Sequence, residues 1–133
     1  MEEEVKLLLT EDDAAAAEMY RIRLEADGYT VITAADGTAG LELATRERPD
    51  LIYLDIRLPH MDGLDVLERL RADARTHAVP VVILSNYGEE ELRARGLELG
   101  AMEFLLKSEI TPAGLAETAE RWTQAQAQPP VST

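Results

Sequence analysis

The chain has 133 residues, 46% of them hydrophobic, which is enough for one compact domain and too little for two domains of ordinary size. Its formal net charge of −13 would repel nucleic-acid phosphates and anionic membrane surfaces, so neither direct nucleic-acid binding nor membrane binding is expected. Cysteine is absent, which excludes disulfides and thiolate metal sites, and no stretch resembles a signal peptide or membrane span, so a cytoplasmic location is expected.

Short apolar runs alternate with segments of helical periodicity along the whole chain. In chain order, the pattern predicts a strand at 5–9, a helix at 14–28, a strand at 29–33, a helix at 37–48, a strand at 51–55, a helix at 64–74, a strand at 79–85, a helix at 89–100, a strand at 103–107 and a helix at 112–127. Regular alternation of this kind is typical of an α/β protein with a parallel sheet covered by helices on both faces.

The first predicted helix has the clearest periodicity. Met19, Ile22 and Leu24 are expected to mark its apolar side, and Gly28 is expected to end it. After the last helix, residues 128–133 include two consecutive prolines and no periodicity. We therefore predict one domain over 1–127, followed by a disordered tail or the remnant of a linker at 128–133.

Polar side chains follow four of the five predicted strands. They are Glu11, Asp12 and Asp13 after the first, Asp55 at the end of the third, Ser85 at the end of the fourth and Lys107 at the end of the fifth. Parallel strands bring their carboxyl ends to one edge of the sheet, where ligands bind in such folds. Carboxylates crowded there repel one another unless a cation holds them, and a set of oxygen ligands without His or Cys favours Mg²⁺. With the lysine and the serine hydroxyl, this edge suits a phosphoryl group, and one carboxylate can be the nucleophile.

These residues resemble the receiver domain of bacterial two-component response regulators, of the stand-alone chemotaxis type, over nearly the whole chain. The family places an acidic pair, a phosphoacceptor Asp, a Ser or Thr and a Lys after successive strands, and Glu11-Asp12, Asp55, Ser85 and Lys107 match that order. The stretch "LDIRLPHMDG" is similar to the family's phosphorylation loop, including its proline and glycine.

The resemblance implies a doubly wound, flavodoxin-like fold, with five parallel strands in the order 2-1-3-4-5 and five helices. It implies that Asp55 is the phosphoacceptor and that Lys107 and Ser85 assist it. Mg²⁺ would be held by Glu11, Asp12, Asp55 and the backbone carbonyl of Arg57. Asp13 would cap the first helix. Ser85 and Phe104 would form the switch, although Phe104 is equally well explained as an ordinary core residue.

The expected function is that of a phosphoacceptor signalling switch rather than an enzyme, apart from catalysis of its own phosphorylation and dephosphorylation. The phosphoryl donor would be a histidine kinase or a histidine phosphotransfer protein. The message would leave through the face formed by the fourth helix, fifth strand and fifth helix, toward a downstream protein target, a further phosphotransfer protein or a domain beyond this sequence. The same face is a candidate surface for a weak homodimer.

Two rival functions stay open from the residues alone. A pseudo-receiver would keep the fold as an interaction module without being phosphorylated, but here the acidic pair, Asp55, Ser85 and Lys107 are all present. A Mg²⁺-dependent phosphohydrolase would use the same groups, but the chain has little room for a substrate-binding cap.

Overall fold

Residues 4–127 are described by a computed structural model. Its elements are β1 (Lys6–Thr10), α1 (Ala14–Ala26), β2 (Thr30–Ala34), α2 (Gly37–Glu47), β3 (Leu51–Asp55), α3 (Gly63–Ala72), β4 (Val81–Ser85), α4 (Glu90–Glu98), β5 (Glu103–Leu106) and α5 (Pro112–Ala127). The predicted strands and helices are confirmed, with ends that move by at most two residues. The predicted tail at 128–133 lies outside the described residues. No helix within 4–127 has the length and apolar character needed to cross a bilayer.

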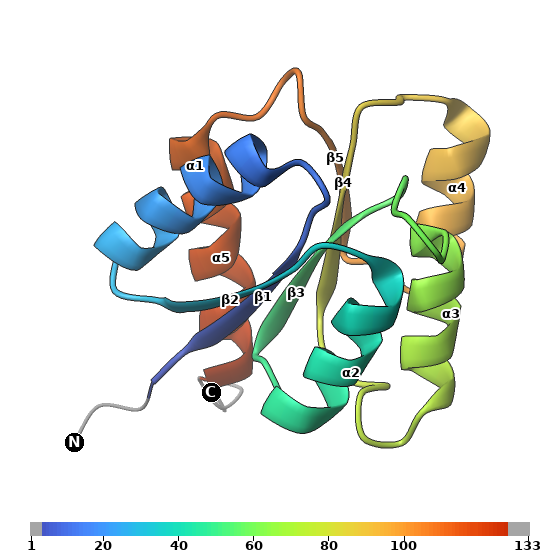
Figure 1. The fold of residues 1–133 in the computed structure, drawn as a ribbon, viewed down its shortest axis with the longest axis horizontal. Helices are drawn as coiled ribbons and strands as arrows, with labels where there is room; N and C mark the ends of the chain where they lie inside the picture. Colours follow the sequence, from blue (N-terminus) through green and yellow to red (C-terminus); the bar gives the residue numbers. More distant parts are fainter. Residues whose placement is uncertain (1–3, 128–133) are drawn as a thin grey trace, which may run out of the picture.

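The five strands form one parallel sheet in the order β2-β1-β3-β4-β5, which confirms the predicted topology (Figure 1). β1, β3 and β4 lie inside the sheet, and each makes ladders with two neighbours. Buried parallel strands read as continuous apolar runs, which explains why "LIYLD" and "VVILS" were recognisable from the sequence.

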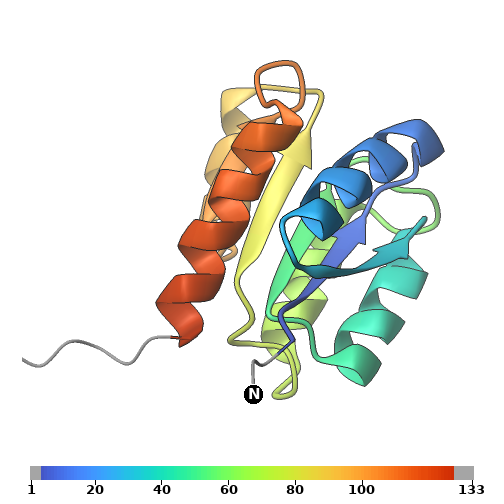
Figure 2. The same cartoon turned by 90° about the vertical axis from the view of Figure 1, so that its left-hand side faces the viewer.

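Helices cover both faces of the sheet, so the core has two halves. In one half, side chains of β1, β3 and β4 pack against α1 and α5, and Figure 2 looks onto these two helices with the sheet behind them. In the other half, the alternate side chains of the same strands pack against α2 and α3, with Phe104 of β5 among them. All five residues of β3 and of β4 are buried. The fold therefore fixes the ends of these strands firmly.

The predicted apolar side of the first helix is wrong. Met19 and Ile22 are 47% and 57% exposed, whereas Tyr20 and Leu24 are the buried residues of α1. Leu24 lies five residues after Met19, about 140° around a helix of 3.6 residues per turn, so the two cannot share one face. The buried side instead follows the four-residue spacing of Ala16, Tyr20 and Leu24. The Asp13 cap is confirmed, because its side chain accepts a hydrogen bond from the Ala16 amide at 3.1 Å.

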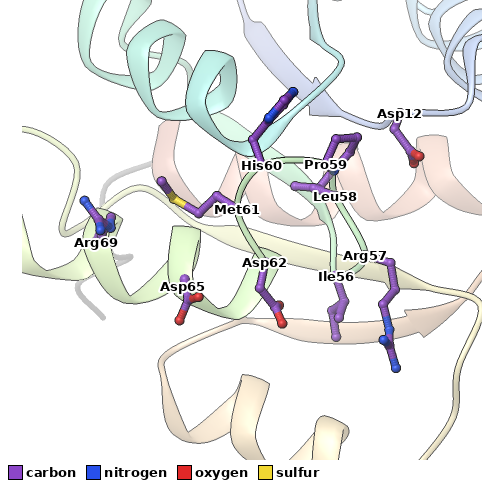
Figure 3. Close-up of a pocket in the computed structure, with 10 residues that line it drawn as sticks. All are labelled: Asp12, Ile56, Arg57, Leu58, Pro59, His60, Met61, Asp62, Asp65 and Arg69. Atoms are coloured by element: carbon purple, nitrogen blue, oxygen red, sulfur yellow. The ribbon is translucent and has the colours of Figure 1, made fainter.

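The loop from β3 to α3 leaves the sheet after Asp55 and folds back, so that Gly63 lies against the backbone of Asp55 and Ile56 (Figure 3). The amide of Gly63 donates a 2.7 Å hydrogen bond to the carbonyl of Ile56. A Cβ at position 63 would collide with the carbonyl oxygen of Asp55 and would lie 2.6 Å from Cα of Ile56. Both obstacles are backbone atoms, so only glycine fits here without moving Asp55.

We therefore expect Gly63→Ala to lower the free energy of unfolding by about 2 kcal/mol, the usual cost of overpacking, in urea denaturation. The control is Gly114→Ala in α5, where the added methyl group meets the end of the flexible Ile110 side chain. Equal stability of Gly63→Ala and the wild type would show that this close approach does not shape the loop.

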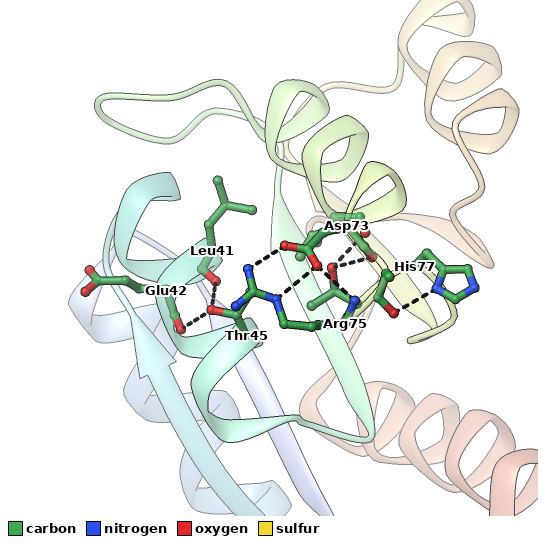
Figure 4. A network of polar contacts seen from close by, with 9 residues as sticks. Leu41, Glu42, Thr45, Asp73, Arg75 and His77 are labelled. Carbon is green, nitrogen blue, oxygen red and sulfur yellow. Dashed lines mark hydrogen bonds and ion pairs between the residues drawn. The ribbon is translucent and has the colours of Figure 1, made fainter.

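Polar contacts order the opposite edge of the sheet, around the connection from α3 to β4 (Figure 4). The Asp73 carboxylate accepts hydrogen bonds from the backbone amide and guanidinium of Arg75, which lower the pKa of Asp73 to about 2. Arg71 donates to the carbonyls of Val79 and Gly100 at 2.7 and 2.9 Å. It therefore links the connection from α3 to β4 with the connection from α4 to β5. The candidate site lies at the other edge of the sheet, where β3 ends at Asp55.

Candidate functional site

The predicted site residues gather at the carboxyl edge of the sheet. Glu11 and Asp12 follow β1, Asp55 ends β3, Ser85 ends β4 and Lys107 follows β5. Asp55 pairs in register with Leu84 and Ser85 with Leu106, so the ends of β3, β4 and β5 are level. Strand register alone therefore brings groups that are distant in sequence to one place.

Three carboxylates form the acidic part of this site. Glu11, Asp12 and Asp55 each offer an oxygen atom, and these oxygens all lie within 4.8 Å of one another. Glu11 and Asp55 are buried, at 3% and 4% exposure, while Asp12 faces solvent. A set of carboxylate oxygens with one open side suits a hard divalent cation that keeps some of its water.

Lys107 lies between the two buried carboxylates. Its Nζ is 2.5 Å from Oε1 of Glu11 and donates a 2.7 Å hydrogen bond to Oδ2 of Asp55. The other Asp55 oxygen, Oδ1, accepts from the amide of Arg57 at 3.1 Å, and Oε2 of Glu11 accepts from the amide of Asp13 at 3.0 Å. These bonds hold the Asp55 carboxylate in one orientation at the mouth of the sheet.

Burial and charge shift two of these groups in the same direction for different reasons. The pKa of Glu11 is raised mainly because burial disfavours its charged form, although hydrogen bonds from Lys107 and Asp13 oppose this. Burial pulls the pKa of Lys107 down, but its hydrogen bonds to Asp55 and Glu11 outweigh burial and leave the pKa raised. The lysine is therefore an ammonium ion at neutral pH, with its charge directed at Asp55.

Ser85 ends β4 and Phe104 lies on β5, and no hydrogen bond found within residues 4–127 joins either of them to the carboxylates. The hydroxyl of Ser85 donates to the carbonyl of Tyr87 and accepts from its amide, at 3.0 and 2.9 Å, so it is held by its own loop. Phe104 is 5% exposed and belongs to the core half under α2 and α3. The core position that the sequence allowed for Phe104 is confirmed, while its part in a switch stays a prediction.

A hollow of about 350 Å³ opens above the cluster. It is lined by Glu11, Asp12, Asp13, Ala16, Tyr20, Asp55, Arg57, Asn86, Tyr87 and Lys107. The Arg57 guanidinium stacks on the Tyr87 ring, 4.7 Å from its centroid. Asp12 and Arg57 also border a wider hollow of about 780 Å³ beside the loop after β3, which Figure 3 shows.

Two features of this hollow were missed by sequence reasoning. The first is Tyr20, which was not identified as a site residue. It follows Ala16 by four residues on the helix that Asp13 caps, and this spacing places it on the side of α1 that borders the acids. The stacking of Arg57 on Tyr87 joins two different loops, and no sequence spacing predicts it.

Comparisons with known proteins agree with this geometry. The model of a family described as the response regulator receiver domain matches residues 7–120. The chain is 41% identical over 102 residues to the DNA-binding dual master transcriptional regulator RpaA of Synechocystis sp., which covers 77% of this chain and 42% of that protein. The chain spans less than half the length of the curated relatives it matches.

Solved structures give the same result. A CheY-like response regulator receiver domain protein from Methanospirillum hungatei JF-1 superposes with a TM-score of 0.87 at 26% identity, over 94% of this chain and 98% of that one. Chemotaxis protein CheY4 of Vibrio cholerae superposes with a TM-score of 0.83 at 29% identity, over 90% and 99% of the two chains. The likeness therefore extends over the whole sheet and its helices.

Proposed function

Because this chain belongs to the response regulator receiver domain family, we propose that it is a phosphoacceptor switch of a two-component phosphorelay in which Asp55 takes the phosphoryl group. The main observation behind this proposal is the contact of the Lys107 ammonium with the Asp55 carboxylate, at the rim of a hollow with two further acids. Such a site combines a nucleophile, a fixed positive charge and oxygen ligands for a cation.

In the proposed reaction, a carboxylate oxygen of Asp55 attacks the phosphorus of a phosphohistidine. The new oxygen–phosphorus bond forms as the phosphorus–nitrogen bond breaks, and the histidine nitrogen keeps the bonding electron pair. Lys107 neutralises charge on the phosphoryl oxygens, and the Arg57 amide fixes the carboxylate. Glu11, Asp12, Asp55 and the Arg57 carbonyl would hold Mg²⁺, which supplies further charge neutralisation when bound.

The donor in this proposal is a histidine kinase or a histidine phosphotransfer protein, and the response leaves through the α4–β5–α5 face. Ser85 would exchange its bonds to Tyr87 for one to a phosphoryl oxygen. Phe104 lies in the core close to α4, where a Cβ on Gly96 would meet its ring at 3.6 Å. A rearrangement at Ser85 can thus be passed through Phe104 to this face, where a downstream protein or a second copy would bind.

The proposal is tested by incubating the protein with acetyl phosphate and Mg²⁺ and measuring its intact mass over time. One phosphoryl adduct per chain supports the switch. No adduct would point to a pseudo-receiver, and rapid release of inorganic phosphate without an adduct would point to a phosphohydrolase. Omission of Mg²⁺ is the matched control, and it should prevent the adduct.

The stacked pair of Arg57 and Tyr87 leads to a prediction about phosphoryl lifetime. Both side chains line the hollow, where they can exclude the water that must approach in line with the phosphorus–oxygen bond. We expect replacement of both by Ala to speed loss of the phosphoryl group about threefold. In the wild type the cation–π contact, worth about 0.5–1 kcal/mol at an exposed site, must break before water can enter, and the double variant does not pay this cost. The decay is timed in excess Mg²⁺ after removal of the donor.

Tyr87→Phe is the control for this experiment, because it keeps the aromatic ring on which Arg57 stacks. Its phosphoryl lifetime should equal that of the wild type. Unchanged or slower decay in the double alanine variant would show that the pair does not shield the site.

A further inference from the structure

Tyr20 is a buried ionisable residue next to the site, and the mechanism proposed above does not use it. Its side chain is only 3% exposed and packs into the core half formed by β1, β3, β4, α1 and α5. It nevertheless lines the same hollow as Asp55 and Lys107. One part of the side chain is therefore surrounded by apolar residues, while another part reaches a polar cavity.

The direction of α1 explains this position. Side chains on a helix lean toward its N-terminus, and the N-terminus of α1 is capped by Asp13, beside the acids. Tyr20 lies seven residues after that cap, nearly two turns along the helix and in line with Ala16, which also borders the hollow. The tyrosine therefore leans back toward the carboxyl edge of the sheet.

Tyr53, on the same side of the sheet, provides a comparison. Its hydroxyl bonds to the Leu115 carbonyl and the Thr118 hydroxyl, at 3.1 and 2.8 Å. For Tyr20, no such bond to another protein group is found within residues 4–127, and the charges of Lys107, Glu11 and Asp55 act on the pKa of its phenol. Burial raises the pKa of Tyr20, so the hydroxyl keeps its proton at neutral pH and is able to donate it.

We propose that Tyr20 is a further binding residue of the site, whose hydroxyl donates a hydrogen bond to the phosphoryl oxyanion on Asp55. The inference rests on the proposed function, and adds a neutral donor that comes from α1 rather than from a strand end. Lys107 bonds to Asp55 and lines the same hollow as Tyr20, so an anion drawn to the ammonium would lie in the hollow that the phenol borders. The Tyr20 hydroxyl would make this hydrogen bond only when Asp55 carries the phosphoryl group.

The test uses Tyr20→Phe, which keeps the ring in the core and removes only the hydroxyl. With Mg²⁺ present, beryllofluoride serves as the probe for a phosphoryl group on Asp55, and its affinity is measured by titration calorimetry. We expect a loss of about tenfold, which corresponds to about 1.4 kcal/mol. The affinity for Mg²⁺ alone and the melting temperature should stay unchanged, because neither involves the oxyanion.

Tyr29→Phe is the matched control, since Tyr29 packs on the same core half without lining the hollow. It should bind beryllofluoride as the wild type does. Equal affinity of Tyr20→Phe and wild type would overturn the inference while leaving the proposed function intact. An equal loss of Mg²⁺ affinity in Tyr20→Phe would overturn it too, because the hydroxyl would then support the acids and not the oxyanion. A wild type that binds no beryllofluoride would overturn the proposed function and this inference with it.

Discussion

We expect Asp55→Asn to take up no phosphoryl group from acetyl phosphate and Mg²⁺, under conditions where the wild type is fully converted. The amide lacks the charged oxygen that attacks phosphorus. Glu11 receives similar contacts from the Lys107 ammonium and the Asp13 amide, so the choice of Asp55 rests on its place at the end of β3, which is the phosphoacceptor position implied by the family resemblance. Intact mass after incubation is the measurement, with circular dichroism to verify that the fold is kept. Asparagine can still accept the bond from the Arg57 amide, so the loop should hold its shape.

Asp65→Asn is the matched control for this experiment. Asp65 is exposed on α3 and borders the wider hollow beside the loop, outside the cluster of three acids. Its replacement removes the same charge and should leave the adduct undiminished. A full adduct on Asp55→Asn would contradict the assignment of Asp55 as the acceptor.

The strands were predictable because their burial leaves a strong local signal. In β3 and β4 every residue is buried, so the apolar runs are continuous and their ends are clear. In α1 the same approach failed for the buried face, because alanines dominate its first turns and Met19 and Ile22 lie exposed on its outer side. Hydrophobicity alone did not reveal which side of α1 faces the sheet. The spacing of Ala16, Tyr20 and Leu24 would have done so.

The location of the site was predictable for a topological reason. Once parallel strands are recognised, the residues after them must share an edge, and this places Glu11, Asp12, Asp55, Ser85 and Lys107 together without knowledge of any side chain. The individual contacts were not predictable. Whether Lys107 bonds to one acid or to two, and whether Arg57 stacks on Tyr87, depends on side-chain rotamers that only the folded surroundings select.

Among the residues of this site, we expect replacement of Lys107 to lower the stability of the fold the most. It is the cation that contacts both buried carboxylates, Glu11 and Asp55. We expect Lys107→Met to lower the free energy of unfolding in metal-free buffer at neutral pH by about 3 kcal/mol, because removal of one partner leaves buried charge uncompensated. Urea denaturation measures the change. Lys6→Met is the control, since Lys6 pairs with Glu47 at the other end of the sheet at 3.6 Å and both side chains are about one third exposed.

A second substitution and a pH series identify the cause of this loss. Adding Glu11→Gln to Lys107→Met removes one of the two stranded charges and should recover a large part of the lost stability. The pKa of Glu11 is already raised above 4.5 in the folded protein, so its ionisation costs stability as pH rises through the folded value, and this cost disappears below about pH 4.5. Without Lys107 the pKa should rise further, so acidification from neutral pH toward 4.5 should stabilise Lys107→Met more than the wild type. If acidification over that range changes the stability of the two proteins equally, the ammonium does not compensate the charge of Glu11, and the expected energetic role of the bridge between the two acids is contradicted.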